Sequence, residues 1–218
     1  MPRYPTTTAL RKYPRTPHLP WSPGATSDDV YLNDTSNFEG REIVVTEKLD
    51  GENTTIHPGG THARSLDSAA HPSRTHMRAL AGQIAHELPG DFRIVGENVY
   101  ATHSIHYTAL PAYFLVFGVQ SGNVSLAWDD VAGYASMLGL PTVPVLYRGP
   151  WNEDAVCACY TGVSLCGGEQ EGYVVRLAEA FDLDDFGTSV AKFVRKGHVT
   201  TDEHWMSKSV WPNELAGS

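Results

Sequence analysis

The feature that most constrains the fold of this chain is the stretch of residues 44–53, which reads Val-Val-Thr-Glu-Lys-Leu-Asp-Gly-Glu-Asn. Its β-branched run favours a strand, which brings a single lysine, Lys48, directly to a Leu-Asp-Gly turn. Asp-Gly between two runs of strand-forming residues is a strong signal for a two-residue hairpin, and a lysine beside such a turn is usually a solvated side chain. The alternative is that Lys48 is a nucleophile. That role requires burial or nearby cations to lower the pKa of the lysine and free its amine.

The remaining patterns predict one α+β domain with mostly antiparallel strands. We expect strands at 41–47, 53–57, 62–66, 92–99, 113–119, 171–177 and 189–195, and helices at 73–88, 128–138 and 152–162. The acidic loop 179–185 is expected to be a solvated surface. Residues 1–24 contain six of the fourteen prolines, so we expect them to form an extended arm. The domain then occupies residues 25–218.

Composition and charge narrow the class of protein. A net charge of −9 argues against a general nucleic-acid coat protein, but it allows a polyanion to bind in a local basic groove. No apolar run approaches the roughly 20 residues that cross a bilayer, and the N-terminal residues do not resemble a signal peptide. The three cysteines at 157, 159 and 166 fit a reducing cytoplasm better than a disulfide framework. Zinc is the alternative for this cluster, although its spacing is not the usual one.

Several side chains interrupt otherwise apolar strand patterns with groups suited to phosphate chemistry. They are Arg64, Glu97, Phe117, Glu171 and Lys192. Each alone has a structural explanation, for example a surface arginine or a core phenylalanine. Together they suit nucleotidyl transfer, in which cations hold phosphate oxygens, carboxylates hold a metal and an aromatic face stacks on a base.

The order Lys-x-Asp-Gly, Arg, Gly-Glu, Phe, Glu-Gly, Lys resembles the six ordered motifs of the covalent nucleotidyltransferase superfamily, which includes polynucleotide ligases and mRNA capping enzymes. The fuller strings resemble ATP-dependent RNA ligases related to phage RNA ligase 2. Residues 46–53 are similar to the nucleophile motif of that group, including the asparagine five residues after the lysine, and residues 96–105 are similar as well. The resemblance runs from about Arg41 to Val199. It implies the nucleotidyltransferase fold of ligase adenylation domains, with antiparallel sheets flanked by helices.

The resemblance also implies a role for each motif residue. Lys48 would be the nucleophile that takes AMP, Glu171 would serve a metal ion, and Lys192 would bind the α-phosphate. The nucleotide would be held by Glu47 and Leu49 beside the adenine, Arg64 on a phosphate, Glu97 on the ribose hydroxyls and Phe117 stacked on the base. Asn53 would assist a later step at the RNA ends. The last motif departs from the family pattern, because Val194 stands where a second basic residue is expected. Strand alternation places Lys196 on the face of Lys192, so Lys196 is our candidate over Arg195.

The implied activity is an ATP-dependent RNA ligase of RNA repair that joins 5′-phosphate and 3′-hydroxyl ends, with ATP and Mg²⁺ or Mn²⁺, in the cytoplasm. A DNA ligase, a capping guanylyltransferase and a non-catalytic RNA-end-binding module are the alternatives. Phage RNA ligase 2 has a separate C-terminal domain, whereas twenty-two residues follow Lys196 here. We therefore expect the RNA grip to come from local cations or from a partner repair protein; the cations are Arg3, Arg11, Lys12, Arg15, Arg195 and Lys208. The histidines and carboxylates of residues 198–204 are expected to belong to a surface tail rather than a metal site.

Overall fold

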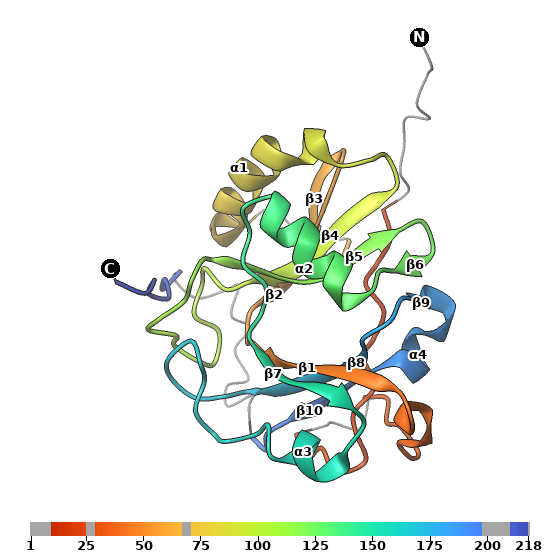
Figure 1. Ribbon diagram of the computed structural model, residues 1–218. Coiled ribbons are helices and arrows are strands. Elements are labelled where there is room, and N and C mark those ends of the chain that lie inside the picture. Colours follow the sequence, from red (N-terminus) through yellow and green to blue (C-terminus); the bar gives the residue numbers. More distant parts are fainter. Residues whose placement is uncertain (1–9, 25–28, 67–70, 198–209, 218) are drawn as a thin grey trace.

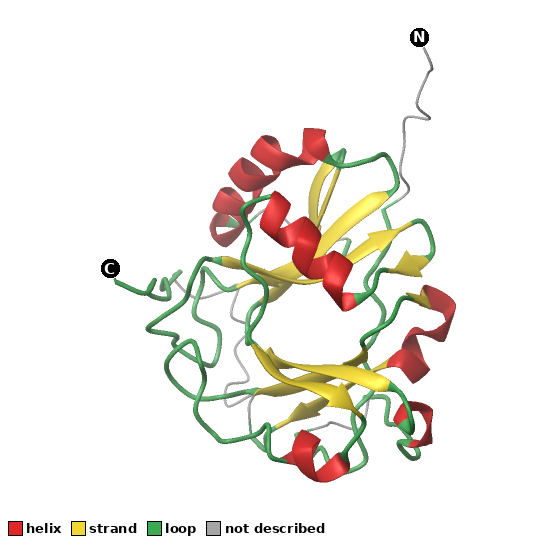
Figure 2. Ribbon diagram, viewed as in Figure 1, coloured by secondary structure: helices red, strands yellow, loops and turns green. Residues whose placement is uncertain are grey.

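The strands form two antiparallel sheets, which lie one above the other in Figures 1 and 2. The computed structural model describes residues 10–24, 29–66, 71–197 and 210–217. In one sheet four strands follow the order β10 (Val190–Val194), β8 (Gly172–Leu177), β1 (Glu42–Lys48) and β7 (Val145–Pro150). In the other sheet six strands follow the order β3 (Gly60–Ala63), β2 (Glu52–His57), β4 (Phe92–Asn98), β5 (Phe114–Ser121), β6 (Val124–Ser125) and β9 (Phe181–Asp182). The α+β class with antiparallel sheets is therefore confirmed.

Short helices pack on the outer sides of the sheets. Helices α1 (Thr75–Ile84) and α2 (Trp128–Met137) cover the six-stranded sheet, α3 (Glu153–Cys157) lies beyond the four-stranded sheet, and α4 (Phe186–Ser189) precedes β10 (Figure 1). Single 3₁₀ turns lie at Ser36–Phe38, Pro72–Arg74, Ala85–Glu87 and Leu183–Asp185. The expected helix at 73–88 is thus an α-helix of ten residues with a 3₁₀ turn at each end.

The Leu-Asp-Gly turn connects the two sheets. Strand β1 pairs with β7 and β8, whereas β2 pairs with β3 and β4. The two strands on either side of the turn are therefore not partners, and the hairpin interpretation is wrong. Glycine is needed at position 51, because a Cβ there would lie 2.5 Å from the carbonyl oxygen of Asn98. The register places Lys48 opposite Gly172 and Asn53 opposite Glu97.

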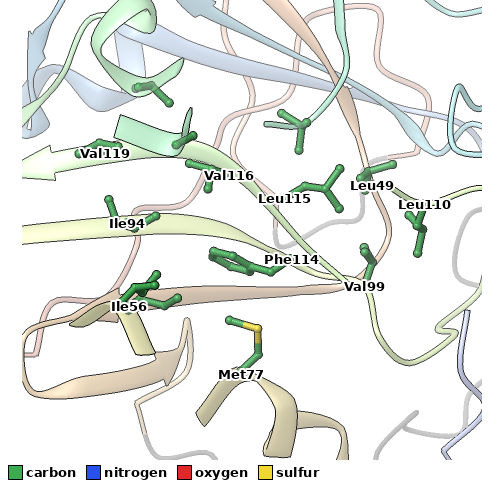
Figure 3. Packing of buried hydrophobic residues seen from close by; sticks show 14 of the residues in the cluster. Leu49, Ile56, Met77, Ile94, Val99, Leu110, Phe114, Leu115, Val116 and Val119 are labelled. Atoms are coloured by element: carbon green, nitrogen blue, oxygen red, sulfur yellow. The ribbon is translucent and has the colours of Figure 1, made fainter. Parts of the chain in front are cut away.

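Each sheet has its own apolar core. Met77 of α1 packs against the six-stranded sheet, where Ile56, Ile94 and Phe114 are almost fully buried (Figure 3). The second cluster, under the four-stranded sheet, includes Leu19 of the Pro-rich segment, which has no exposed surface. The backbone of this segment bonds to β10, because Leu19 N donates to Lys192 O at 2.8 Å and Lys192 N donates to Pro17 O at 2.9 Å. This part of the arm is therefore docked onto the domain.

Some elements differ from the sequence expectation. Strand β7 has mostly exposed and half-exposed side chains and contains Gly149 and Pro150, so it lacks the apolar alternation that identifies a strand. The expectation that the acidic loop 179–185 is a solvated surface is wrong for its apolar residues. Phe181 and Leu183 are buried in the second core, while the neighbouring aspartates remain exposed.

Candidate active site

A cavity of about 510 Å³ lies between the two sheets and receives side chains from both of them. This volume is within the range typical of small-molecule sites. The sequence-predicted residues that line it are Glu47, Lys48, Leu49, Asn53, Arg64, Glu97, Phe117 and Lys192. These residues come from six separate stretches of the chain, and the turn between β1 and β2 carries Lys48 and Leu49 into the site.

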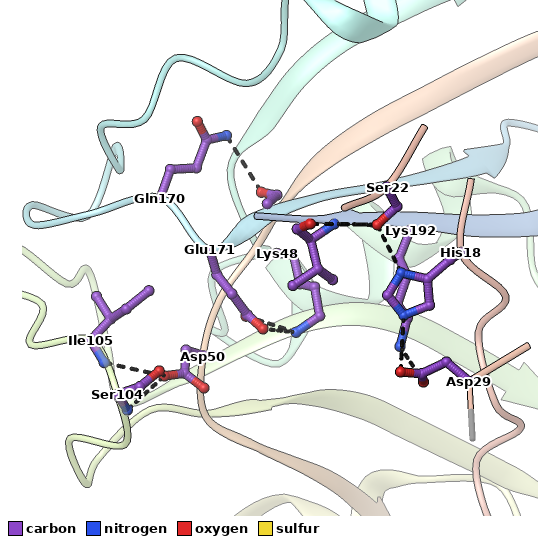
Figure 4. Close-up of polar contacts among 12 residues, drawn as sticks. His18, Ser22, Asp29, Lys48, Asp50, Ser104, Ile105, Gln170, Glu171 and Lys192 are labelled. Atoms are coloured by element: carbon purple, nitrogen blue, oxygen red, sulfur yellow. Dashed lines mark hydrogen bonds and ion pairs between the residues drawn. The ribbon is translucent and has the colours of Figure 1, made fainter. Parts of the chain in front are cut away.

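Lys48 ends β1 and forms an ion pair with Glu171, the residue immediately before β8. The Nζ of Lys48 donates to both carboxylate oxygens of Glu171, at 2.6 and 2.7 Å (Figure 4). The Glu171 side chain is 3 % exposed and the Lys48 side chain 27 %. This contact follows from the register, since β8 begins beside Lys48.

The pKa of Lys48 is raised above its ordinary value. Burial acts to lower this pKa, but the negative charges of Glu171, Glu97 and Asp50 and the hydrogen bond from Glu171 outweigh the burial. The expectation that cations would lower the pKa of Lys48 is therefore wrong for the unliganded protein. In the unliganded protein the Lys48 side chain is therefore held as an ammonium by its carboxylate partner.

The two carboxyl groups near Lys48 are themselves perturbed. Burial raises the pKa of Glu171, although the charge of Lys48 opposes the shift. Burial also raises the pKa of Glu97, to about 8, again against the charge of Lys48. A carboxyl with such a pKa is mostly protonated at neutral pH, so Glu97 can both donate and accept a hydrogen bond in the cavity.

The cations of the cavity have their own partners. The Nε of Arg64 donates to the carbonyl oxygen of Tyr13 at 3.2 Å, and the Nζ of Lys192 lies 3.5 Å from Asp29 Oδ1 (Figure 4). Burial lowers the pKa of both Arg64 and Lys192. Partial burial in a cavity strengthens the attraction of these cations for phosphate oxygens.

The remaining motif residues fall into two groups. Glu47 is 2 % exposed and accepts a hydrogen bond from Leu165 N at 3.0 Å, while Leu49 packs in the apolar core at the cavity wall. The Oδ1 of Asn53 is buried and has no hydrogen-bond partner among the described residues, which suits a ligand contact. Lys196, in contrast, is exposed beyond the end of β10 and does not line the cavity. Its neighbour Arg195 pairs with Glu169 at 2.7 Å.

An aromatic region of the cavity surrounds Phe117. Tyr13 of the arm meets Phe117 edge to face, with ring centroids 5.5 Å apart, and meets Phe186 in the same way at 5.2 Å. Arg176 also lines the cavity; its guanidinium donates to Leu126 O at 2.6 Å and lies over the Phe181 ring at 5.3 Å. Burial lowers the pKa of Arg176 to about 10.

Sequence reasoning missed four contributors to this site: Tyr13, Arg176, His103 and the Glu52–Arg74 ion pair. Arg176 carried a usable signal, because it is a charged residue in an apolar strand pattern. The other contributors come from segments whose position depends on tertiary structure.

No group of three or more His, Cys, Asp or Glu side chains is arranged to hold a metal ion within the described residues. The three cysteines form no disulfide; Cys157 is exposed and Cys166 is buried. The histidine and acidic residues at 198–204 lie outside the described residues. Among the described residues, no helix has the length and apolar character needed to cross a membrane.

The two sheets and the lysine cavity between them define a nucleotidyltransferase fold. A family model described as RNA ligase matches residues 41–194, and the chain therefore belongs to the RNA ligase family. An apo mutant of Naegleria gruberi RNA ligase superposes with a TM-score of 0.55 at 18 % identity, covering 74 % of this chain and 51 % of that one. An archaeal ATP-dependent RNA ligase has a TM-score of 0.55 at 17 % identity, covering 85 % and 48 %.

A further mutant of the Naegleria enzyme, solved with ATP and Mn, has a TM-score of 0.53 at 18 % identity and covers 74 % of this chain and 52 % of that one. The chain thus spans about half the length of these solved structures. At such low identity the likeness shows the fold. No curated protein sequence matches the chain.

Proposed function

We propose that this chain is an ATP-dependent RNA ligase that joins 5′-phosphate and 3′-hydroxyl ends through a covalent lysyl-AMP. One observation carries the proposal: the only lysine of the Lys-x-Asp-Gly turn lies in a cavity between two sheets, paired with a carboxylate and accompanied by Arg64 and Lys192. Membership of the RNA ligase family supports the polynucleotide substrate. The solved ligase with ATP and Mn supports ATP and a divalent cation.

In the first step the Nζ of Lys48 attacks the α-phosphorus of ATP. A P–N bond forms, the bond from this phosphorus to the bridging oxygen of the β-phosphate breaks, and pyrophosphate leaves with the electron pair. The Nζ ammonium loses one proton before it attacks and a second one after the P–N bond has formed. Both protons pass to water, because Lys48 attacks only after it has separated from the Glu171 carboxylate, which lies 2.6 Å away in the unliganded protein. Arg64 and Lys192 offset the negative charge of the phosphate oxygens.

The metal assignment rests on Glu171. Mg²⁺ is commonly held by one or two carboxylates together with water and substrate phosphates, so a single glutamate fits without a dedicated protein cage. A divalent cation held by Glu171 and the triphosphate would neutralise phosphate charge and replace Lys48 as the partner of this carboxylate.

The nucleoside would bind in the aromatic part of the cavity. Phe117 offers a stacking face to adenine, Glu47 and Leu49 lie beside it, and Glu97 hydrogen-bonds the ribose hydroxyls. The pKa of about 8 leaves Glu97 able to donate as well as accept such a bond.

The two later steps act on RNA. An oxygen of the RNA 5′-phosphate attacks the phosphorus of AMP, the P–N bond breaks, and the Lys48 nitrogen takes up two protons to become an ammonium again. The 3′-hydroxyl oxygen of the other end then attacks the 5′-phosphate, a phosphodiester forms and AMP leaves. We assign Asn53 to this stage, because its buried Oδ1 has no partner among the described residues.

The arm supports a grip on the RNA backbone. Tyr13, Pro14 and Thr16 line the cavity, so the flanking cations Lys12 and Arg15, both exposed, lie beside its opening. Arg11 precedes them, whereas Arg3 and Lys208 lie outside the described residues. A partner repair protein would add to this grip if joining by the chain alone proves weak. The free thiols suit the cytoplasm as the site of action.

Intact-protein mass spectrometry after incubation with ATP and Mg²⁺, followed by peptide mapping, tests the proposal. We expect one AMP on Lys48 and no adduct in Lys48→Arg, because a guanidinium is not deprotonated in proteins. Labelling with GTP instead of ATP would indicate a capping enzyme, and preference for DNA ends would indicate a DNA ligase. An AMP adduct that persists in Lys48→Arg would refute the assignment of the nucleophile.

A further inference from the structure

Residues 210–217 form a segment that is bound along the loop of residues 99–113. Asn213, which is 2 % exposed, is the centre of this contact. Its Nδ2 donates to Val99 O at 2.8 Å and to Ala101 O at 3.4 Å, while its Oδ1 accepts from Thr102 Oγ1 and Tyr107 N, both at 2.9 Å. All hydrogen-bonding atoms of this amide are therefore used on one loop.

The backbone of the segment adds further bonds to the same loop. Asn213 N donates to Tyr100 O at 2.9 Å, Glu214 N donates to Tyr107 O at 2.9 Å, and Ala216 N donates to Leu110 O at 2.8 Å. In the other direction, Leu110 N donates to Glu214 O at 3.0 Å. The loop has no α-helix or named strand between β4 and β5, so its conformation depends on these external partners.

The same loop holds Asp50 of the lysine turn. One carboxylate oxygen of Asp50 accepts from Ser104 N at 2.8 Å, from Ser104 Oγ at 2.5 Å and from Ile105 N at 3.2 Å (Figure 4). The backbone N–H of Asp50 donates to the hydroxyl of Tyr107 at 2.8 Å. Tyr107 has no exposed surface, so its ring fixes the position of that hydroxyl.

The other neighbour of Lys48 is tied to the same loop. Glu47 accepts from Leu165 N at 3.0 Å, and the adjacent Cys166 O accepts from Ala109 N at 2.8 Å. The close approach depends on Gly168, where a Cβ would lie 2.5 Å from His106 O. The loop therefore supports the lysine turn on both sides of the nucleophile.

We propose that Asn213 is a positioning residue for Lys48, acting through Tyr107 and Asp50. The proposal rests on the function proposed above and adds a residue outside the six motifs to the same site. Without the amide, the buried Val99 O and Tyr107 N and the half-buried Thr102 Oγ1 each lose a hydrogen-bond partner, which favours a shift of the loop. A misplacement of about 1 Å at a reacting group lowers a rate about 100-fold, so even a partial shift is measurable.

Four variants separate positioning from general stability: Asn213→Ala, Tyr107→Phe, the double variant, and Glu214→Gln as the matched control. Glu214→Gln changes an exposed side chain of the same segment, whose carboxylate lies 3.7 Å from His106 Nε2, and leaves the backbone bonds of Glu214 to Tyr107 and Leu110 in place. The measurement is single-turnover adenylylation of Lys48 against ATP concentration, well below the unfolding temperature.

We expect Asn213→Ala to lower the maximal adenylylation rate about tenfold and Tyr107→Phe to lower it a few-fold, with half-saturating ATP little changed. The double variant should be no slower than Asn213→Ala alone, because both changes act on one path. Glu214→Gln should adenylylate as the wild type does. A double variant in which the two rate losses multiply would overturn the proposal. A wild-type rate in folded Tyr107→Phe would overturn it as well, and this test remains available even if Asn213→Ala fails to fold.

Amide hydrogen exchange gives a readout that is independent of the reaction. The Asp50 amide should exchange faster in Tyr107→Phe and Asn213→Ala, and at the wild-type rate in Glu214→Gln; unchanged exchange in the first two would contradict the proposal. If the wild-type protein takes no AMP, the proposed function is refuted instead. The exchange measurement then still shows whether Asn213 and Tyr107 hold the lysine turn in place.

Discussion

Replacing Lys48 by methionine should destabilise the protein as well as inactivate it. In the unliganded protein the lysine is the ion-pair partner of Glu171, whose side chain is 3 % exposed. Methionine keeps the length of the aliphatic stem but leaves the buried carboxylate without a cation. Breaking a buried pair in this way costs about 3–5 kcal/mol. Since the Lys48 side chain is 27 % exposed, solvent screening favours the lower end, about 3 kcal/mol.

The loss should depend on pH. Burial already raises the pKa of Glu171 against the opposing charge of Lys48, and removing that charge raises the pKa further. In Lys48→Met, the cost of the unpaired Glu171 carboxylate is therefore fully present above this higher pKa. The cost disappears as the pH falls through that pKa, because Glu171 then becomes protonated and neutral. The difference in unfolding free energy between wild type and Lys48→Met should be largest at pH 8 and small near pH 5.

Urea unfolding at several pH values measures this difference, and thermal melts should show a fall of roughly 6–12 °C at pH 8. Lys48→Arg is the matched control, since it keeps the cation and the stability but takes no AMP. Lys48→Met combined with Glu171→Gln should recover most of the loss, because no buried charge is then unpaired. Equal stability of Lys48→Met and wild type at pH 8, or an equal loss at pH 5 and pH 8, would refute the reasoning.

Three further predictions follow from the charges of the site. Glu171→Gln should slow adenylylation while shifting its pH–rate profile to lower pH, because less negative charge then opposes the effect of burial on the pKa of Lys48. Glu97→Gln should weaken ATP binding measured by calorimetry. In urea unfolding, the wild type should lose roughly 2–5 kcal/mol of stability as the pH rises from 4.5 through about 8, because Glu97 then becomes charged in its buried position. The Glu97→Gln variant should not show this loss. Replacing the arm cations by glutamine should leave adenylylation nearly unchanged but lower RNA joining. These cations are Arg11, Lys12 and Arg15. The RNA affinity of the wild type should fall roughly tenfold or more between 50 and 200 mM salt, and the affinity of the substituted protein should fall less.

The sequence predicted most strands because β-branched and apolar runs identify them locally. It did not predict their partners. The Asp-Gly signal correctly indicated a sharp turn, but a turn cannot specify a hairpin when the strand before it pairs with β7 and β8. The extended strand β7 escaped detection because an edge strand with few buried side chains has no apolar alternation.

The site was predictable to the extent that its residues are charges inside apolar strands. Glu97, Glu171 and Lys192 share that property, and the structure brings all three near Lys48. The direction of the Lys48 pKa was not predictable, because it is set mainly by a carboxylate 123 residues away in the sequence. Tyr13 was missed for a similar reason, since only the docking of the arm brings it to Phe117.

The charge balance of the unliganded cavity favours nucleotide binding together with a divalent cation. Lys48 is neutralised by Glu171 and Lys192 lies near Asp29, whereas Arg64 and Arg176, which also line the cavity, donate to backbone carbonyls. A triphosphate that approached Lys48 without a cation would be repelled by the Glu171 carboxylate, the ion-pair partner of Lys48, because like charges at short range oppose each other strongly in a partly enclosed site. Under the proposed function, a divalent cation entering with the triphosphate would offset this carboxylate and release Lys48 from Glu171. In the unliganded protein the ion pair holds Lys48 as an ammonium.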